Sequence, residues 1–301
     1  MTLTHIVSAN EDGLTLEQLL RGPLSLSARQ SREAKKAGGV TVDGAPFFSN
    51  QRLRAGQSVR VALADYAPPR ETGALHGVRV LYEDDALLAV YKPALLQCHP
   101  SPSAPGGSDT LEARVSAHLH ASAHPVHRLD AETRGIVLFA KLPYAQAHLQ
   151  RQMQEGRFQK AYRAWIFGVP SPESGEINAP IARLTPDSFT RVVRADGQHA
   201  ATRYAVLRTV QIPPCGESPR VSLVSLEPLT GRTHQLRVHM AHIGCPLLGD
   251  ARYGTPASQS ASLALGLSHH QLAAVSLRFT HPMTGKTVAL SCTQEFDFSA
   301  P

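Results

Sequence analysis

Short apolar patterns divide the first part of the chain into helices and strands. Leucines that recur every three to four positions around Leu16 indicate one helix, and a polar, basic run indicates a second helix that ends at Gly38. Val40 and Val42 alternate with polar neighbours and predict a strand that ends in an Asp-Gly turn. The expected helices are residues 14–20 and 28–36, and the expected strands are residues 40–42 and 59–63. Residues 1–64 are therefore predicted to form a small α/β domain.

A Pro- and Gly-containing linker at residues 65–77 is expected to lead into a larger domain at residues 78–301. Four consecutive apolar residues from Ile136 to Phe139 predict a buried strand in this domain. The other expected strands are residues 78–82, 87–91, 160–168, 201–207 and 221–226 and a terminal hairpin at 277–290, and the expected helices are residues 111–119, 144–154 and 236–243. The last helix is expected to begin at a cap formed by Thr230 or Thr233. Strands outnumber helices and follow one another through short turns, which predicts an α+β fold with a mixed, mostly antiparallel sheet.

Charge and cysteine usage narrow the classes of protein. The chain has 301 residues, a formal net charge of +6 and a pI of about 9.3. A basic protein suits an anionic partner, and nucleic acid is the usual one. The four cysteines have no Cys-x-x-Cys spacing, which argues against a zinc ribbon or a disulfide framework and is typical of a reducing compartment. No apolar run reaches the roughly 20 residues of a membrane span, and the N-terminus lacks a secretory pattern. We expect a cytoplasmic monomer without a membrane partner.

A charged segment leads directly into the strand predicted at Ile136. Arg128 and Asp130 lie two positions apart, so they would share one face of an extended segment. Gly135 allows the backbone to turn as it enters the strand. A guanidinium and a carboxylate beside a buried strand cost free energy unless they are paired or used. From these residues alone, a structural ion pair and an active site both remain open interpretations.

A second polar segment is rich in histidine, but the spacing of its histidines argues against a metal site. His234 and His239 are five positions apart and do not form the zinc pair found on helices, and His239 and His242 lack a nearby carboxylate. Neither a Gly-x-Ser-x-Gly elbow nor a glycine-rich phosphate loop occurs in the chain. Asp130 is a better candidate for the catalytic residue than these histidines, because an ionised carboxylate can act as a nucleophile. Arg237, which stays charged at every working pH, could pair with it.

Four motifs occur in an order that resembles the RluA-type pseudouridine synthase family. They are Lys92-Pro93 followed by His99-Pro100, His127-Arg128-Leu129-Asp130-x-x-Thr133-x-Gly135, Lys160-x-Tyr162-x-Ala164, and Gly231 to His239 with Gly249-Asp250. The resemblance covers residues 78 to about 290. It implies an isomerase that converts uridine in RNA to pseudouridine with neither a metal nor an organic cofactor.

The resemblance also implies roles for single residues. Asp130 would be the essential catalytic carboxylate, acting either as nucleophile or as base, and Arg237 would pair with it. Tyr162 would stack on the target base and assist the late proton transfer. Arg128 would fill the place of the uridine when it flips out of the RNA stack, which favours a target in a loop or a deformable stem. Further RNA contacts are expected from His127, Arg134, Arg232 and Gln235. Arg134 stands where the family usually has Ser.

Residues 1–64 resemble the small RNA-binding αL domain that is named after a small-subunit ribosomal protein. The resemblance rests on Gly39-Val40-Thr41-Val42-Asp43-Gly44, a strand followed by a turn. The basic helical face before it would follow RNA phosphates, or it would simply be solvated; it comprises Arg29, Arg32 and Lys36. Ribosomal RNA is the expected partner, with transfer RNA as the alternative. Two other classes are a non-catalytic RNA-binding or ribosome-assembly protein on the same fold, and a metallohydrolase built on the histidine-rich helix.

Overall fold

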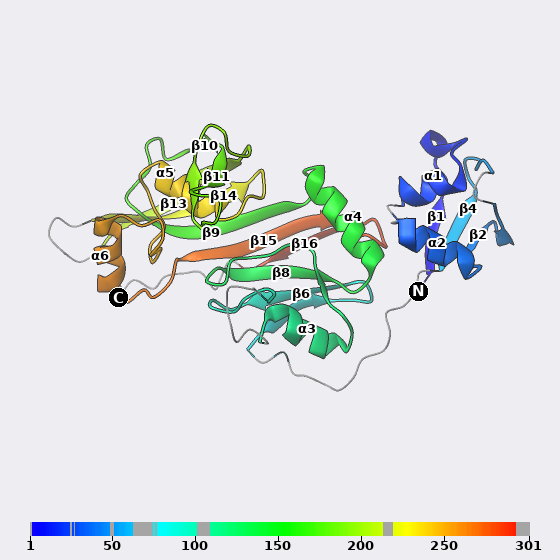
Figure 1. Cartoon of the computed structure of the whole chain (residues 1–301), viewed down its shortest axis with the longest axis horizontal. Helices are drawn as coiled ribbons and strands as arrows, with labels where there is room; N and C mark the ends of the chain where they lie inside the picture. The colour runs from blue at the N-terminus through cyan, green and yellow to red at the C-terminus, as the bar shows by residue number, and fades with distance from the viewer. Residues whose placement is uncertain are drawn as a thin grey trace.

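The structure is a computed structural model of the chain, shown in Figure 1. It describes residues 2–24, 26, 28–48, 51–62, 75, 77–100, 109–212 and 219–292, except for the side chain of Arg29. The expected linker at residues 65–77 lies almost entirely outside these residues, so its boundaries stay a prediction. No helix among the described residues is long and apolar enough to cross a membrane.

The N-terminal segment forms its own sheet and its own apolar core. Its elements are β1 (Thr2–Ile6), η1 (Ala9–Glu11), α1 (Leu16–Arg21), α2 (Ala28–Lys36), β2 (Val40–Val42), β3 (Ala45–Pro46) and β4 (Ser58–Ala62). The strands pair in the order β1-β4-β2-β3, and every pair is antiparallel. Helix α1 begins at Thr15, whose hydroxyl accepts a hydrogen bond from the Gln18 backbone N–H at 3.2 Å. Leu19, Leu20 and Leu53 are fully buried in the core. The predicted helices and strands are confirmed, and β1 was not predicted.

The rest of the described chain is organised around one long sheet, which runs across Figure 1. Its strands are β5 (Arg79–Glu83), β6 (Leu87–Lys92), β7 (His124–Pro125), β8 (Arg134–Ala140), β9 (Gln159–Phe167), β10 (Ser174–Asn178), β13 (Ala201–Gln211), β14 (Arg220–Pro228), β15 (Leu272–Thr280) and β16 (Thr287–Ser291). The main order is β10-β13-β14-β9-β15-β8-β6-β5, and β7 and β16 pair with β8 and β15. Among the described strands only β8 and β15 pair in parallel. This arrangement confirms the predicted α+β fold with a mostly antiparallel sheet.

Strand β8 is apolar from Ile136 to Ala140 because helices cover both of its faces. Val137 and Phe139 pack in one core with α3 (Leu111–Leu119), and Ile136 and Leu138 pack in another with α4 (Pro143–Gln154). A strand buried on both faces reads as a continuous apolar run and not as an alternating one. Thr110 caps α3 by accepting a hydrogen bond from the Ala113 N–H at 3.2 Å. The strand and both helices agree with their predictions.

Gly135 is required by a close approach between β8 and β15. Its φ is +119°, and a Cβ at this position would lie 2.2 Å from the carbonyl oxygen of Ala274. Ala274 is also its partner in the parallel pair. A side chain would therefore separate the two strands where the segment containing Asp130 enters the sheet.

Replacing Gly135 with alanine is expected to lower the free energy of unfolding by roughly 2–4 kcal/mol, from overpacking and from the unfavourable φ. Denaturant unfolding would measure this loss. Gly156→Ala is the matched control, because its φ is +70° but no atom lies within 4 Å of an added Cβ. The control should cost about 1 kcal/mol. Equal losses in the two variants would contradict the steric argument.

The C-terminal half differs from the prediction in two respects. Helix α5 spans Gln235–His242, and its N-cap is His234 in a left-handed conformation with φ 57°, not Thr230 or Thr233. The hydroxyl of Thr230 instead bonds the side chain of Gln235 at 2.7 Å. The sequence also did not predict β10, a separate hairpin of β11 (Ile181–Arg183) and β12 (Arg191–Val193), or α6 (Pro256–Ala264).

Candidate active site

Asp130 lies in the loop between β7 and β8 and lines a cavity of about 780 Å³. Its backbone carbonyl accepts a hydrogen bond from the Thr133 N–H at 3.1 Å, which closes a turn just before β8. The side chain is about one-third exposed, at 32%. The cavity is also lined by Tyr162 of β9, by the C-terminal half of α4 and by the loop that precedes α5. Segments far apart in the sequence therefore meet around one carboxylate.

Arg237 joins Asp130 to a second, buried carboxylate. Its Nη1 lies 3.3 Å from Asp130 Oδ2, so the predicted pair is formed. Its Nε and Nη2 donate to the two carboxylate oxygens of Asp250 at 2.7 and 2.8 Å. Burial alone would lower the pKa of Arg237, but Asp250 and Asp130 raise it, so the guanidinium stays charged. Asp250 is fully buried and fixes the plane of the guanidinium. No role was predicted for Asp250 beyond its place in the Gly-Asp motif.

His234 and Tyr253 connect Asp130 to the β11–β12 hairpin. The Tyr253 hydroxyl accepts a hydrogen bond from the Arg191 N–H at 2.9 Å and lies 2.7 Å from His234 Nδ1. The other ring nitrogen of His234, Nε2, lies 3.9 Å from Asp130 Oδ2. Burial is the main cause that lowers the pKa of His234 to about 4, so the ring is neutral at physiological pH. The Arg237 guanidinium lies 5.0 Å from the centre of the Tyr253 ring.

Tyr162 is buried, and its ring packs among the core residues of the sheet. Burial, followed by the charge of Asp130, raises the pKa of its hydroxyl. The hydroxyl therefore stays protonated at physiological pH. An uncharged ring at the cavity wall can stack on a base and offer a proton donor, as the predicted role requires.

Lys92 and Cys98 hold the segment that carries Asp130, a role that was not predicted from the sequence. The Lys92 side chain is fully buried and donates to three carbonyls, those of Pro93 at 2.9 Å, Leu96 at 2.7 Å and Ala131 at 2.7 Å. Burial lowers its pKa to about 8. The Cys98 thiol accepts a hydrogen bond from the Leu129 N–H at 3.3 Å. The only signal in the sequence was the Lys-Pro pair of the first motif.

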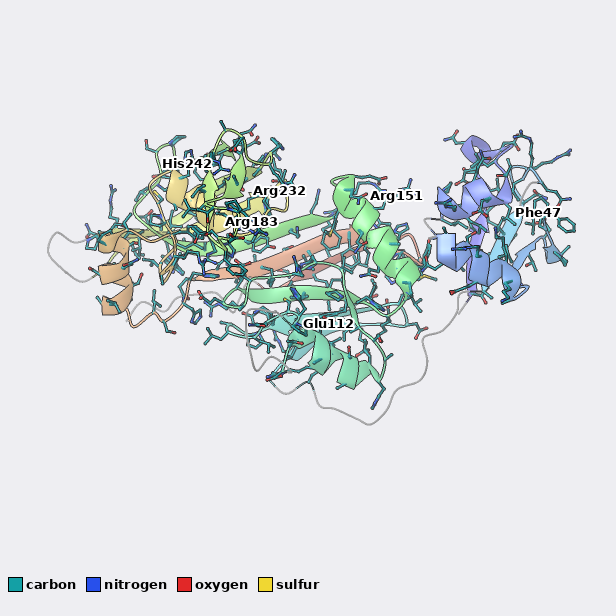
Figure 2. All side chains as sticks on the ribbon, viewed as in Figure 1. Phe47, Glu112, Arg151, Arg183, Arg232 and His242 are labelled. Carbon is teal, nitrogen blue, oxygen red and sulfur yellow. The ribbon has the colours of Figure 1, made fainter. Side chains whose placement is uncertain are left out.

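Two of the predicted RNA-contacting arginines lie at the edge of the cavity. Arg128 and Arg232 are exposed and line it. Arg128 Nη1 lies 2.9 Å from His99 Nε2, and Arg232 donates from Nε to the His199 carbonyl at 2.9 Å. Figure 2 labels Arg232 in the part of the molecule that contains α5. Both predicted arginines are placed where a phosphate backbone could reach them.

Three other residues that were predicted to contact RNA are less exposed than Arg128 and Arg232. His127 is buried, accepts from the Leu138 N–H at 3.4 Å, and has a pKa that burial lowers to about 3. Gln235 is also buried and bonds Thr230, Thr202 and the backbone of Ala201 and Arg232. Both residues line the wall of the cavity, and the side chain of Gln235 already uses its polar groups inside the protein. Arg134 lies at the start of β8, donates to Gln271 at 3.1 Å, and is not among the described residues that line the cavity.

The histidine-rich helix is structural. His239 is fully buried, and its two ring nitrogens bond the Thr202 hydroxyl and the Ala179 carbonyl, each at 2.9 Å. Within the described part of the chain, no group of three His, Cys, Asp or Glu side chains is arranged to hold a metal ion. The metallohydrolase alternative has no support in these contacts.

Comparison with known proteins decides the family. Residues 86–242 match the family model described as RNA pseudouridylate synthase. The chain belongs to the RNA pseudouridylate synthase family. An uncharacterized RNA pseudouridine synthase of Mycobacterium bovis is 32% identical over 286 residues, which cover 92% of this chain and 90% of that protein. Ribosomal large subunit pseudouridine synthase C of Vibrio vulnificus is 31% identical over 307 residues, 96% of this chain and 93% of that protein.

A solved structure supports the same assignment. Human RNA pseudouridylate synthase domain containing 1 is 25% identical, has a TM-score of 0.60, and covers 76% of this chain and 89% of its own. The predicted resemblance to pseudouridine synthases is therefore confirmed, and this RNA pseudouridylate synthase is an isomerase that acts on RNA.

Changing Tyr253 to phenylalanine tests whether the link from the hairpin matters for the reaction. The ring and its contact with Arg237 are kept, but the hydrogen bonds to Arg191 and His234 are lost. The rate at saturating RNA should fall on the order of 10-fold, because His234 and Asp130 lose their fixed geometry, while RNA affinity is unchanged. Single-turnover kinetics separate the two quantities.

Tyr204→Phe is the matched control, since it removes a hydrogen bond of 3.1 Å to the Pro172 carbonyl outside the cavity. The control should turn over at the wild-type rate. A weaker RNA affinity at unchanged rate in Tyr253→Phe would show that Tyr253 serves binding and not positioning.

Proposed function

We propose that this RNA pseudouridylate synthase converts specific uridines of ribosomal RNA to pseudouridine, with Asp130 as the essential carboxylate. The observation that carries the proposal is the chain of charges Asp130–Arg237–Asp250 at the wall of a cavity large enough for a nucleotide. The Vibrio vulnificus relative is named for the large ribosomal subunit, which favours ribosomal over transfer RNA. An intact, oriented carboxylate also argues against the alternative of a non-catalytic RNA-binding or ribosome-assembly protein.

The proposed reaction needs no atom from outside the substrate. The bond between C1′ and N1 breaks, uracil rotates in the cavity, and C5 forms the new bond to C1′. C5 then loses its proton, and N1 gains one. Asp130, held by Arg237, attacks the sugar or removes a proton from it, and Tyr162 stacks on the free base. No step calls for a cofactor.

The target uridine is proposed to flip out of the RNA stack to reach Asp130. Flipping costs a few kcal/mol, so a loop or a weakly paired stem is the favoured target. Arg128 is exposed at the edge of the cavity, only two residues before Asp130. Its planar guanidinium could stack in the place that the uridine leaves.

The N-terminal unit is proposed to add RNA affinity. Arg32 and Lys36 are exposed on α2, while the side chain of Arg29 lies outside the described residues. The unit is joined to the catalytic sheet through α4, the helix that carries Arg151 (Figure 2). Tyr144 packs in the N-terminal core, and Arg151 donates to the Gly22 carbonyl. Through the same helix, Gln150 and Met153 line the cavity. RNA held by the N-terminal unit would therefore lie near the reaction site.

We further propose a cytoplasmic monomer. The described cysteines Cys98, Cys245 and Cys292 are buried free thiols, which suits a reducing compartment.

The proposal is tested by mapping pseudouridines in RNA from cells with and without the gene. One or a few positions in ribosomal RNA should lose pseudouridine, and the wild-type gene should restore them. Loss confined to transfer RNA would correct the substrate class. An unchanged map, in cells where the protein still cross-links to RNA, would favour the non-catalytic alternative.

A further inference from the structure

Lys160 extends the cavity beyond the residues that have a role in the reaction. It lies two positions before Tyr162 in β9, so both side chains are on the same face of the strand, about 6.6 Å apart along it. Both line the cavity that contains Asp130. Gln150 and Met153 of α4 line it as well. Lys160 is therefore inside the same cavity, displaced from the stacking position of the base.

Lys160 has no partner within the described part of the chain. No hydrogen bond or ion pair joins its amino group to another described residue, and burial lowers its pKa with no carboxylate opposing the shift. Asp130 is the only carboxylate among the described residues that line the cavity, and it is paired with Arg237. The neighbouring His127 is neutral, so it neither repels nor balances the amino group.

The two buried cations of the site, Arg237 and Lys92, already have partners. Arg237 is held by Asp250 and Asp130, and Lys92 donates to three carbonyls. Lys160 is half-buried, and a cation that is partly removed from water without a partner costs free energy. An anion that enters the cavity would recover this cost, so the environment of Lys160 is that of a binding site for a negatively charged group.

We propose that Lys160 binds a phosphodiester of the substrate RNA, the one next to the flipped uridine. This inference rests on the proposed function. Each nucleotide carries one such phosphate, and the separation of Lys160 from Tyr162 along β9 is comparable with the distance between neighbouring groups of an extended RNA strand. With Tyr162 against the base and Lys160 against the adjacent phosphate, the substrate strand would run along β9, towards α4 and the N-terminal unit.

The test uses stem-loop RNAs that contain a uridine found by the mapping experiment, each with a single uncharged methylphosphonate linkage near the target. Binding is measured by fluorescence anisotropy, without regard to turnover. For the wild-type protein, one linkage adjacent to the uridine should weaken binding roughly 10-fold, as expected for loss of one charge-assisted contact. Lys160→Met should bind the unmodified RNA roughly 10-fold more weakly, and that linkage should no longer matter. Lys160→Arg should keep the sensitivity of the wild type.

Lys286→Met is the matched control, because Lys286 is an exposed lysine beyond β15 and outside the lining of the cavity. It should keep the full sensitivity to the modified linkage. Lys160→Met with wild-type sensitivity would overturn the proposal, and so would a wild-type protein that responds to no adjacent linkage. If Lys160→Met does not fold, Lys160→Gln takes its place in the same comparison. Failure of the wild-type protein to form pseudouridine in these RNAs would count against the proposed function, whereas the binding result concerns Lys160 alone.

Discussion

Replacing Asp130 with asparagine is expected to abolish pseudouridine formation, with a loss in rate on the order of 10⁴-fold or more. The amide cannot act as a nucleophile or as a base at this position, and the shape of the side chain is kept. Tritium release from RNA labelled at C5 of uracil would measure the loss, because the C5 proton leaves only when the new bond to C1′ has formed. RNA affinity should change little, since Arg128 and Arg232 remain at the edge of the cavity.

Asp196→Asn is the matched control for this experiment. Asp196 is an exposed carboxylate paired with Arg194 outside the cavity, so its loss should leave the rate unchanged. Full activity in Asp130→Asn would refute the assignment of the catalytic carboxylate, whatever the mapping of modified sites had found. A parallel loss of RNA affinity and rate would instead indicate that Asp130 organises the RNA-binding surface.

Replacing Asp250 with asparagine is expected to lower the free energy of unfolding by roughly 3 kcal/mol, because the buried charge of Arg237 loses its main partner. The rate should fall as well, since the guanidinium is no longer held in the plane that faces Asp130. Chemical denaturation and single-turnover kinetics measure the two effects. The double variant Asp250→Asn/Arg237→Met should recover much of the stability but none of the activity, because it removes the unpaired charge.

The pH dependence of the free energy of unfolding independently tests the ion pair between Asp250 and Arg237. Burial alone would raise the pKa of Asp250, but its bonds with Arg237 hold it below the ordinary value. A carboxylate with a depressed pKa stabilises the fold fully above its unfolded-state pKa and loses that contribution as the pH falls through the folded-state pKa. The wild type and Asp250→Asn should therefore differ most near neutral pH and converge in acid. If the difference in stability between the two proteins stayed constant from neutral to acidic pH, the stabilisation by Asp250 would not be ionic.

Local patterns were enough to predict most helices and strands and the pair Asp130–Arg237. The apolar run of β8 is a property of neighbouring residues, so the sequence reveals it directly. The left-handed His234 at the start of α5 could not be read in the same way. Six consecutive buried residues, Gln235 to Met240, follow it, and no amphipathic pattern reports such burial.

The predicted RNA contacts also show that a local sequence pattern does not reveal which side chains are buried. Arg128 and His127 are neighbours in one motif, yet the first is exposed at the cavity edge and the second is buried as a neutral ring. Their residue types suit RNA equally well. Which one faces solvent depends on how the loop before β8 meets α4 and β9, and that is a property of packing between distant segments.

The sequence by itself determined the mostly antiparallel α+β fold, the family and the identity of the candidate carboxylate. These follow from short patterns and from motifs whose order along the chain is visible without coordinates. The tertiary structure alone decided that Asp250 holds Arg237, that Lys92 holds the Asp130 loop and that Gly135 must lack a side chain. It also decided that Lys160 lies in the cavity without a partner among the described residues. Burial and charge balance at a residue depend on segments brought together from across the chain, and no local pattern contains that information.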